Sequence, residues 1–154
     1  MYVSEIMSKN IAVCFPDMNI KECANLMVQN DCGEIPVVGS EADKKLIGVI
    51  TDRDITCRVV ANGINPCEAK VKDYMTKNIY TVKIDDDLEY CQQLMSEHQV
   101  RRLPVVDDKM VCIGIVSQAH AARHASKEGA GELAKDLSRS RSSLEAPTQN
   151  VGNM

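Results

Sequence analysis

A hydroxyl and a carboxylate stand three residues apart where a strand pattern gives way to a helix pattern. The segment Gly48-Val-Ile-Thr51-Asp-Arg-Asp54 places Thr51 at the expected start of the helix and Asp54 one turn into it. A carboxylate there can accept hydrogen bonds from both vicinal hydroxyls of a ribose, each worth about 1.5–3 kcal/mol. Thr51 can offer its hydroxyl and nearby backbone N–H groups to a phosphate, which the helix dipole also favours. The alternative interpretation is that Thr51 only caps the helix and Asp54 is an ordinary first-turn acid.

The chain contains one pattern of residues twice. Val3–Ile11 recurs as Val71–Ile79, and from Val3 to Val38 12 of 36 positions are identical to the residues 68 places later. Further along, Gly48–Thr51 matches Gly114–Ser117 at an offset of 66. A duplicated unit of this size predicts two half-domains related by approximate two-fold symmetry, with function in the groove between them.

The two copies differ at the position of the Asp54 carboxylate. Ser117 stands where the first copy has Thr51, but His120 stands where it has Asp54. A neutral imidazole has one acceptor nitrogen and cannot accept two hydroxyl protons as a carboxylate does. We therefore expect one good site, built on Asp54, and a second that is empty, weak or used for something other than a ribose.

Each copy predicts the same order of elements. A helical turn (3–7; 71–75) and a brief strand (11–15; 79–82) precede an amphipathic helix, whose apolar residues recur at helical spacing between Ile20 and Val28. Two strands joined by a polar turn follow, and then a second helix (52–61; 118–127). The fold class is therefore mixed α/β (α+β), with a β-α-β-β-α unit at 1–68 and another at 69–126. Residues 127–154, rich in Ser and Arg, are predicted to be a flexible tail.

These repeated motifs resemble the cystathionine-β-synthase (CBS) domain pair, or Bateman module. The resemblance rests on Val-x-x-x-Met-Ser/Thr-Lys-Asn-Ile at 3–11 and 71–79, on Pro-Val-Val at 36–38 and 104–106, and on the segments 48–54 and 114–120. It covers residues 1 to about 126 and is closest to small stand-alone bacterial proteins made of one such pair. It implies pseudo-two-fold packing, two ligand clefts between the copies and a homodimer. It also implies adenine-containing ligands: AMP, ADP or ATP, and less often NAD or S-adenosylmethionine.

The resemblance also assigns expected roles to residues. The segment 48–54 matches the family's nucleotide signature Gly-h-h-Thr/Ser-x-x-Asp, in which h is apolar. Arg101 and Arg102 lie where phosphate-binding basic residues of the family tend to fall, and Arg101 is expected to reach a phosphate whose ribose is held by Asp54. Arg53 is expected to face the other cleft. Pairing with surface acids is the alternative for these arginines. An apolar slot for adenine is expected near Ile11, Ala12 and Ile35.

Composition excludes several classes of function. Aromatic residues make up 3% of the chain, which argues against a base-stacking surface, and a net charge of −4 gives no sign of a nucleic-acid or membrane surface. There is no signal peptide and no run of ~20 apolar residues, so we expect a cytoplasmic protein. No nucleophile–base pair or glycine-rich phosphate loop is recognisable. The chain is therefore expected to be a non-enzymatic sensor without a required cofactor, acting through an unknown effector protein.

Two alternatives remain open. One is a redox- or metal-responsive regulator that uses Cys and His side chains, and the other is a structural scaffold whose ligand site has decayed. The odd number of cysteines, seven, and the absence of Cys-x-x-Cys favour reduced, buried thiols. His120 and His124 have the i, i+4 spacing of metal ligands, but no third ligand is evident nearby, which favours ordinary helix-surface histidines.

Overall fold

A computed structural model describes residues 1–124, and the predicted tail at 127–154 lies outside them. The sequence of elements follows the predicted repeat closely. The described helices and strands are, in order, α1 (Val3–Ile6), α2 (Ile20–Asn30), β1 (Glu34–Val38), β2 (Leu46–Thr51), α3 (Asp52–Asp54), the π-helix η1 (Ile55–Val60), α4 (Val71–Tyr74), α5 (Leu88–His98), β3 (Arg102–Val106), β4 (Cys112–Ser117) and α6 (Gln118–His124).

The chain packs as two compact units, and each unit takes pieces from both repeats. We name them after a residue of interest. The Asp54 unit consists of Lys9–Thr81 and Val106–Gly114, and the described part of the His120 unit consists of Met1–Ser8, Val82–Val105 and residues 115–124. The short leading helix of each repeat therefore packs in the unit that holds the main body of the other repeat.

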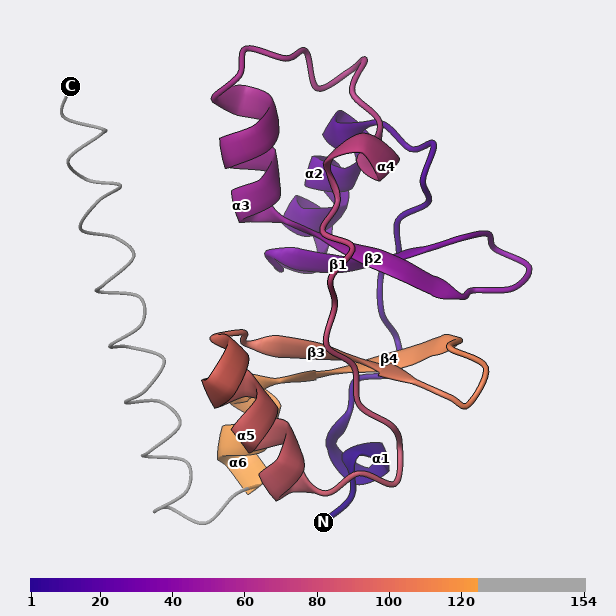
Figure 1. Ribbon diagram of the computed structural model, residues 1–154, viewed down its shortest axis with the longest axis vertical. Helices are drawn as coiled ribbons and strands as arrows, with labels where there is room; N and C mark the ends of the chain where they lie inside the picture. The colour runs from indigo at the N-terminus through magenta and orange to yellow at the C-terminus, as the bar shows by residue number, and fades with distance from the viewer. Residues whose placement is uncertain (125–154) are drawn as a thin grey trace, which may run out of the picture. The chain divides into compact units, whose positions relative to one another are not determined.

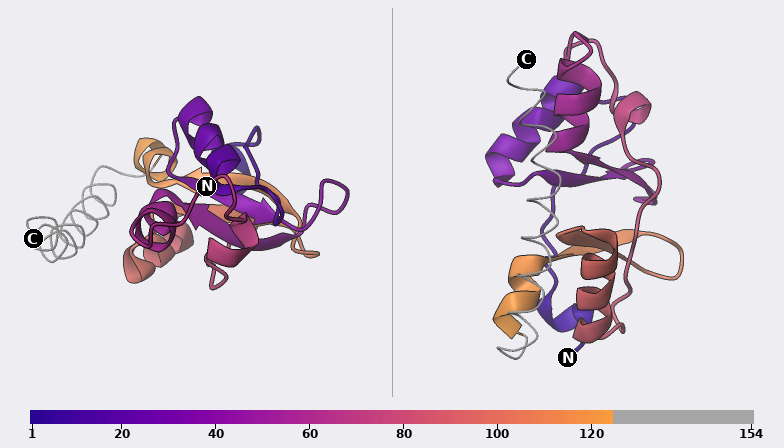
Figure 2. Two further views of the ribbon diagram at one scale, coloured as in Figure 1. Left: turned by 90° about the horizontal axis from the view of Figure 1, so that it is seen from above. Right: turned by 60° about the vertical axis from the view of Figure 1, so that its left-hand side comes forward.

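In the Asp54 unit, β1 and β2 form an antiparallel hairpin whose register pairs Glu34 with Thr51 and Val37 with Gly48. Figure 1 shows α2, the α3–η1 helix and α4 on one side of this hairpin, and the right-hand view of Figure 2 agrees. The core between them contains only small and medium apolar side chains, as expected for a chain with no Trp and one Phe. The buried members of this cluster are Cys14, Ile20, Cys23, Met27, Ile35, Val37, Ile50, Val59, Ala69, Val71 and Met75.

The leading segment of each repeat is held by backbone hydrogen bonds to the other repeat. Val71 N–H donates to the carbonyl of Met18 at 2.9 Å, and Ile20 N–H donates to the carbonyl of Ala69 at 2.9 Å. In the His120 unit, Val3 N–H donates to the carbonyl of Asp86 at 2.9 Å, and α1 lies with α5 and α6 on one side of β3 and β4 (Figure 1). These bonds explain why each packing unit contains segments of both sequence repeats.

The strands predicted at 11–15 and 79–82 are reduced to single bridges, and prolines explain most of the loss. Cys14 bridges Val37 in parallel, with Cys14 N–H donating to the carbonyl of Pro36 and Val38 N–H donating to that of Cys14, both at 2.9 Å. The neighbouring rungs on the two sides would need N–H donors from Pro36 and Pro16, which have none. The predicted extended strand was therefore wrong in length, although its central residue is paired.

Helices α2 and α5 confirm the prediction from apolar spacing. Both run for 11 residues and begin at a side-chain cap, because Asn19 accepts from Glu22 N–H and Asp87 accepts from Tyr90 N–H, each at 2.8 Å. Each ends at a residue in the left-handed conformation, Asp31 (φ 48°) and Gln99 (φ 55°). The two repeats thus build their main helix in the same way.

Gly48 is required because the chain of the second repeat passes directly over it. A Cβ built at Gly48 would lie 2.8 Å from the carbonyl oxygen of Thr76 and 2.9 Å from the sulfur of Met75. We expect Gly48→Ala to lower the free energy of unfolding by about 1–3 kcal/mol, because the backbone pairing of Val49 with Thr76 must shift. Urea denaturation measures this change.

Gly39→Ala is the matched control, because its Cβ would meet nothing closer than an Asp43 carboxylate oxygen at 3.6 Å. Equal losses of stability in the two variants would contradict the close approach at Gly48.

Candidate functional site

Among residues 1–124, Asp54 is the charged residue that the fold buries, with 8% of its surface exposed. It lies at the end of α3, directly after β2, as the sequence predicted. A buried carboxylate is costly unless it is hydrogen-bonded or paired with a cation. The contacts of Asp54 supply both, and they define the candidate site.

Thr51 and Asp54 form a reciprocal cap at the start of α3. The Thr51 hydroxyl oxygen accepts from Asp54 N–H at 3.0 Å, and Oδ2 of Asp54 accepts from Thr51 N–H at 3.0 Å. Thr51 therefore caps the helix, which both interpretations of this motif allow. Because a carboxylate has about four lone-pair positions, the cap leaves acceptor capacity on Asp54 for other donors.

Thr76 supplies a further donor to the same carboxylate, and the sequence analysis did not assign it a role. Its hydroxyl lies 3.1 Å from both carboxylate oxygens of Asp54. The Thr76 backbone is fixed by two hydrogen bonds with Val49, at 2.8 and 2.9 Å. The signal was present in the sequence, because Thr76 follows Met75 in the repeated Val-x-x-x-Met-Ser/Thr motif.

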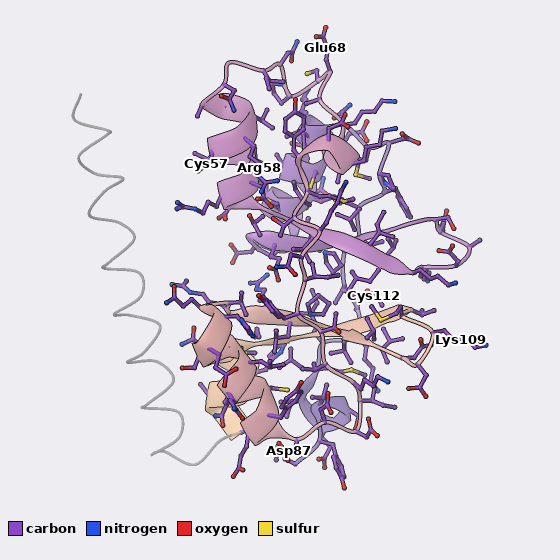
Figure 3. All side chains as sticks on the ribbon, in the orientation of Figure 1. Cys57, Arg58, Glu68, Asp87, Lys109 and Cys112 are labelled. Atoms are coloured by element: carbon purple, nitrogen blue, oxygen red, sulfur yellow. The ribbon has the colours of Figure 1, made fainter. Side chains whose placement is uncertain are left out.

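Arg58 provides the cation, and it too was missed. Its Nε lies 3.7 Å from Oδ1 of Asp54, and a terminal guanidinium nitrogen donates to the carbonyls of Tyr74 at 3.2 Å and Met75 at 3.3 Å. Figure 3 shows Arg58 on the helix that follows α3. Arg58 therefore connects that helix, the end of α4 and the buried carboxylate.

The helix that carries Arg58 is not the regular α-helix that its sequence predicts. Residues Ile55–Val60 are π-helical, and Ala61 N–H donates to the carbonyl of Thr56, five residues earlier, at 2.9 Å. Short π-helical turns are rare and are frequent at functional sites. Gly63, with φ 67°, follows the end of this helix.

A pocket of about 480 Å³ opens beside the Asp54 network. This volume falls within the range of about 300–1,000 Å³ that is usual for small-molecule sites. Arg58 and Thr76, which both contact the Asp54 carboxylate, belong to its wall. Three cationic residues and one acidic residue are among the lining residues, which are Arg58, Lys72, Asp73, Met75, Thr76, Lys77 and Asn78.

The second repeat copies the cap with a different acceptor. Ser117 Oγ accepts from His120 N–H at 3.2 Å, and Ser117 N–H donates to Nδ1 of His120 at 3.4 Å. Burial, with the positive charges of Arg123, Arg102 and His124, lowers the pKa of His120 below 6.5. A neutral ring with Nδ1 unprotonated is what this cap requires, so His120 reproduces the shape of the cap without the negative charge of Asp54.

The other predicted site residues are divided between the units. Arg53 is exposed on α3, and Ile11 and Ala12 are half-buried in the Asp54 unit. Ile35 is fully buried and belongs to the core of that unit. Arg101 and Arg102 are half-buried in the His120 unit, where the Arg101 carbonyl accepts from Gln118 N–H at 2.7 Å.

The described residues contain neither a metal-binding cluster nor a helix that could cross a membrane. Within residues 1–124, no three His, Cys, Asp or Glu side chains gather closely enough to hold a metal ion. None of the helices in this part of the chain has the length and apolar character needed to cross a membrane.

A model of the CBS domain matches residues 3–60 and, a second time, residues 71–127. A CBS domain-containing protein of Bacillus subtilis (strain 168), YhcV, is 36% identical over 137 residues, which are 88% of this chain and 94% of YhcV. A homoserine O-acetyltransferase of Methanococcus vannielii is 37% identical over 115 residues, 75% of this chain but only 23% of that enzyme. The similarity to YhcV therefore extends over nearly its whole length.

Three solved structures have similar folds. Hypoxic Response Protein I with two coordinated zinc ions has a TM-score of 0.73 at 29% identity, covering 82% of this chain and 100% of that chain. The CBS domain pair of protein MJ0100 in complex with 5′-methylthioadenosine and S-adenosylmethionine scores 0.70 at 28% identity, with coverages of 80% and 94%. CBSX2 in complex with AMP scores 0.68 at 28% identity, with coverages of 79% and 93%. The mixed helix–strand fold predicted from the sequence is confirmed.

The lowered pKa of His120 predicts how stability changes with pH. Below its ordinary pKa of 6.5, the unfolded chain binds a proton at His120 more readily than the folded chain does. The contribution of His120 to stability is therefore fully present above pH 6.5 and is lost as the pH falls through the lowered folded value. Urea denaturation of the parent and of His120→Asn across this window tests the prediction. As the pH falls, we expect the free energy of unfolding to decrease less in His120→Asn than in the parent. Identical pH profiles of the two proteins would contradict the prediction.

Proposed function

Since this chain belongs to the CBS domain family and carries the domain twice in tandem, we propose that it is a regulatory module that binds an adenine nucleotide. The observation that carries the proposal is the buried carboxylate of Asp54, with its donors and the adjoining pocket. Two of the similar structures, the MJ0100 domain pair and CBSX2, contain AMP, 5′-methylthioadenosine or S-adenosylmethionine, which share an adenosine group.

Asp54 is the proposed acceptor for the ribose. The Thr76 hydroxyl now donates to its carboxylate from 3.1 Å, and a ribose hydroxyl can make the same bond in its place. The Thr51 N–H and the Arg58 guanidinium, at 3.0 and 3.7 Å, hold the carboxylate in its orientation during that exchange. Asp54 would then exchange one hydroxyl donor for another, so its buried charge would not be left unpaired.

The charges of the pocket favour a ligand that carries phosphate. Arg58, Lys72 and Lys77 line it against one acid, Asp73, although Lys72 also pairs with Asp17 at 3.1 Å. We therefore place AMP, ADP or ATP ahead of S-adenosylmethionine as the ligand. The phosphate-binding role that the family resemblance gives to Arg101 and Arg102, which belong to the His120 unit, stays a prediction.

The second repeat is proposed to bind such a ligand weakly or not at all. His120 presents a neutral nitrogen at the position of Asp54, and that nitrogen already accepts from Ser117 N–H. A ligand that binds two conformations unequally shifts the equilibrium between them. We propose that this shift occurs in a homodimer and is recognised by a separate effector protein.

Isothermal titration tests the ribose role of Asp54. Protein shown to be folded and free of ligand is titrated with AMP, ADP and ATP, and we expect at least one to bind. Asp54→Asn should weaken that binding by about 10- to 100-fold, since it removes the charge from hydrogen bonds worth about 1.5–3 kcal/mol. Asp52→Asn is the control, because Asp52 is an exposed carboxylate in the same helix. Absence of binding by all three nucleotides would contradict the proposed function, and equal effects of the two variants would contradict the site.

A pair of ligands tests the phosphate contact separately. AMP carries a 5′-phosphate and 5′-methylthioadenosine does not. Lys77→Met should therefore lower the affinity for AMP by about tenfold and leave the affinity for 5′-methylthioadenosine nearly unchanged. Lys45→Met, on the β1–β2 turn outside the pocket, is the control and should alter neither affinity. Equal losses for both ligands would show that Lys77 does not bind phosphate.

A further inference from the structure

Two cysteines that do not line the pocket meet inside the Asp54 unit. The sulfur atoms of Cys14 and Cys23 are 3.1 Å apart, and both residues are fully buried. A disulfide bond is about 2.0 Å long, so closing this pair requires a movement of about 1 Å. Cys14 belongs to the segment that forms the single bridge to Val37, and Cys23 belongs to the second turn of α2.

The duplication provides an internal comparison. At the offset of 68, Cys23 corresponds to Cys91, but Cys14 corresponds to Val82. Val82 forms the same bridge, to Val105, and is 1% exposed. A valine therefore meets the packing requirement at this position, and the thiol of Cys14 is not needed to fill the core. Only one of the two repeats carries the thiol pair.

We propose that Cys14 and Cys23 form a reversible disulfide when the protein meets hydrogen peroxide. Cys23, as thiolate, attacks one peroxide oxygen, the O–O bond breaks, and the departing hydroxide takes up the proton released from Cys23 as water. The Cys14 sulfur then attacks the sulfenic acid of Cys23. An S–S bond forms, the S–O bond breaks, and the hydroxyl leaves with the Cys14 proton as a second water. Two thiols are oxidised and one peroxide is reduced, and a dithiol reverses the bond by exchange.

The roles of the two sulfurs follow from their hydrogen bond. Cys14 donates its S–H to Cys23, which lowers the pKa of Cys23, whereas that bond and burial raise the pKa of Cys14. Cys91 has no such donor, and burial beside Asp86 and Asp87 raises its pKa to about 12. Cys23 therefore forms the reactive thiolate more readily than Cys91, its counterpart in the other repeat.

The local structure gives a small oxidant access to the pair. The segment around Cys14 is held to the sheet by one bridge, because the prolines at 16 and 36 remove the next rungs. Segments with few backbone hydrogen bonds open at low free-energy cost, so a molecule close to water in size can reach the sulfurs transiently. The disulfide would tie this segment covalently to α2.

Peptide mapping tests the proposal on the full chain. Reduced protein is exposed to hydrogen peroxide, denatured, alkylated with N-ethylmaleimide and digested. We expect a linked pair of peptides containing Cys14 and Cys23, and a loss of two of the seven titratable thiols that dithiothreitol restores. Because Cys23 and Cys32 lie on one tryptic peptide, the experiment is repeated with Cys32→Ser, in which the link should persist.

Two further variants complete the test. Cys14→Val carries the residue found at the same place in the second repeat, and it should fold and form no internal disulfide. Replacement of the exposed Cys57 (Figure 3) and Cys67 by serine should leave the Cys14–Cys23 link intact. In the oxidised parent, but not in Cys14→Val, the thermal midpoint should rise by several degrees.

Three results would overturn the proposal. One is oxidation of Cys57 or Cys67 while Cys14 and Cys23 stay reduced, and another is a link that involves Cys32 instead. The third is a persistent reduced state of all seven thiols. None of these outcomes depends on whether the protein binds a nucleotide.

Discussion

The Asp54 unit depends on a single buried carboxylate that is satisfied from three directions. Thr51 contributes its backbone N–H from the end of β2, Thr76 contributes its hydroxyl from the start of the second repeat, and Arg58 contributes a charge from the next helix. Each donor comes from a different stretch of chain, so the carboxylate joins the first repeat to the segment that follows α4. A buried charge of this kind is stable only while its partners remain in place. The same feature that fixes the local fold is thus the one that the proposed ligand would contact.

Comparison of the two repeats separates what the fold needs from what a ligand needs. Both strand-to-helix junctions keep a reciprocal cap, with Thr51 and Asp54 in one and Ser117 and His120 in the other. Only the first cap is anionic. If capping were the only requirement, a histidine could cap the first junction, as His120 caps the second. The cap itself therefore does not require the negative charge of Asp54, which is in keeping with its proposed role as a ribose acceptor.

Local sequence patterns identified the repeat, the main helices, the hairpin strands and the Thr51–Asp54 cap, because each depends on residues close together in the chain. They did not identify Thr76 or Arg58 as partners of Asp54, since those contacts require α4 to pack beside the π-helical turn. The strand at 11–15 was overestimated because apolar β-branched residues suggested pairing that Pro16 and Pro36 prevent. The Cys14–Cys23 contact was also not foreseen. Both cysteines looked like small core residues, and only the packing of α2 against the Cys14 segment brings their sulfurs together.

The exchange of leading helices between repeats has a consequence for how such a chain arises. The Asp54 unit is completed by α4 of the second repeat, and the His120 unit is completed by α1 of the first. A polypeptide with one repeat alone would lack the turn that closes its own hydrophobic cluster, and it would have to borrow that turn from a sister molecule. When two copies are joined in one chain, the leading helix that each unit needs belongs to the same molecule. Completion of each hydrophobic core then no longer depends on protein concentration. Once fused, the halves are free to diverge, and an acid in one can become an imidazole in the other.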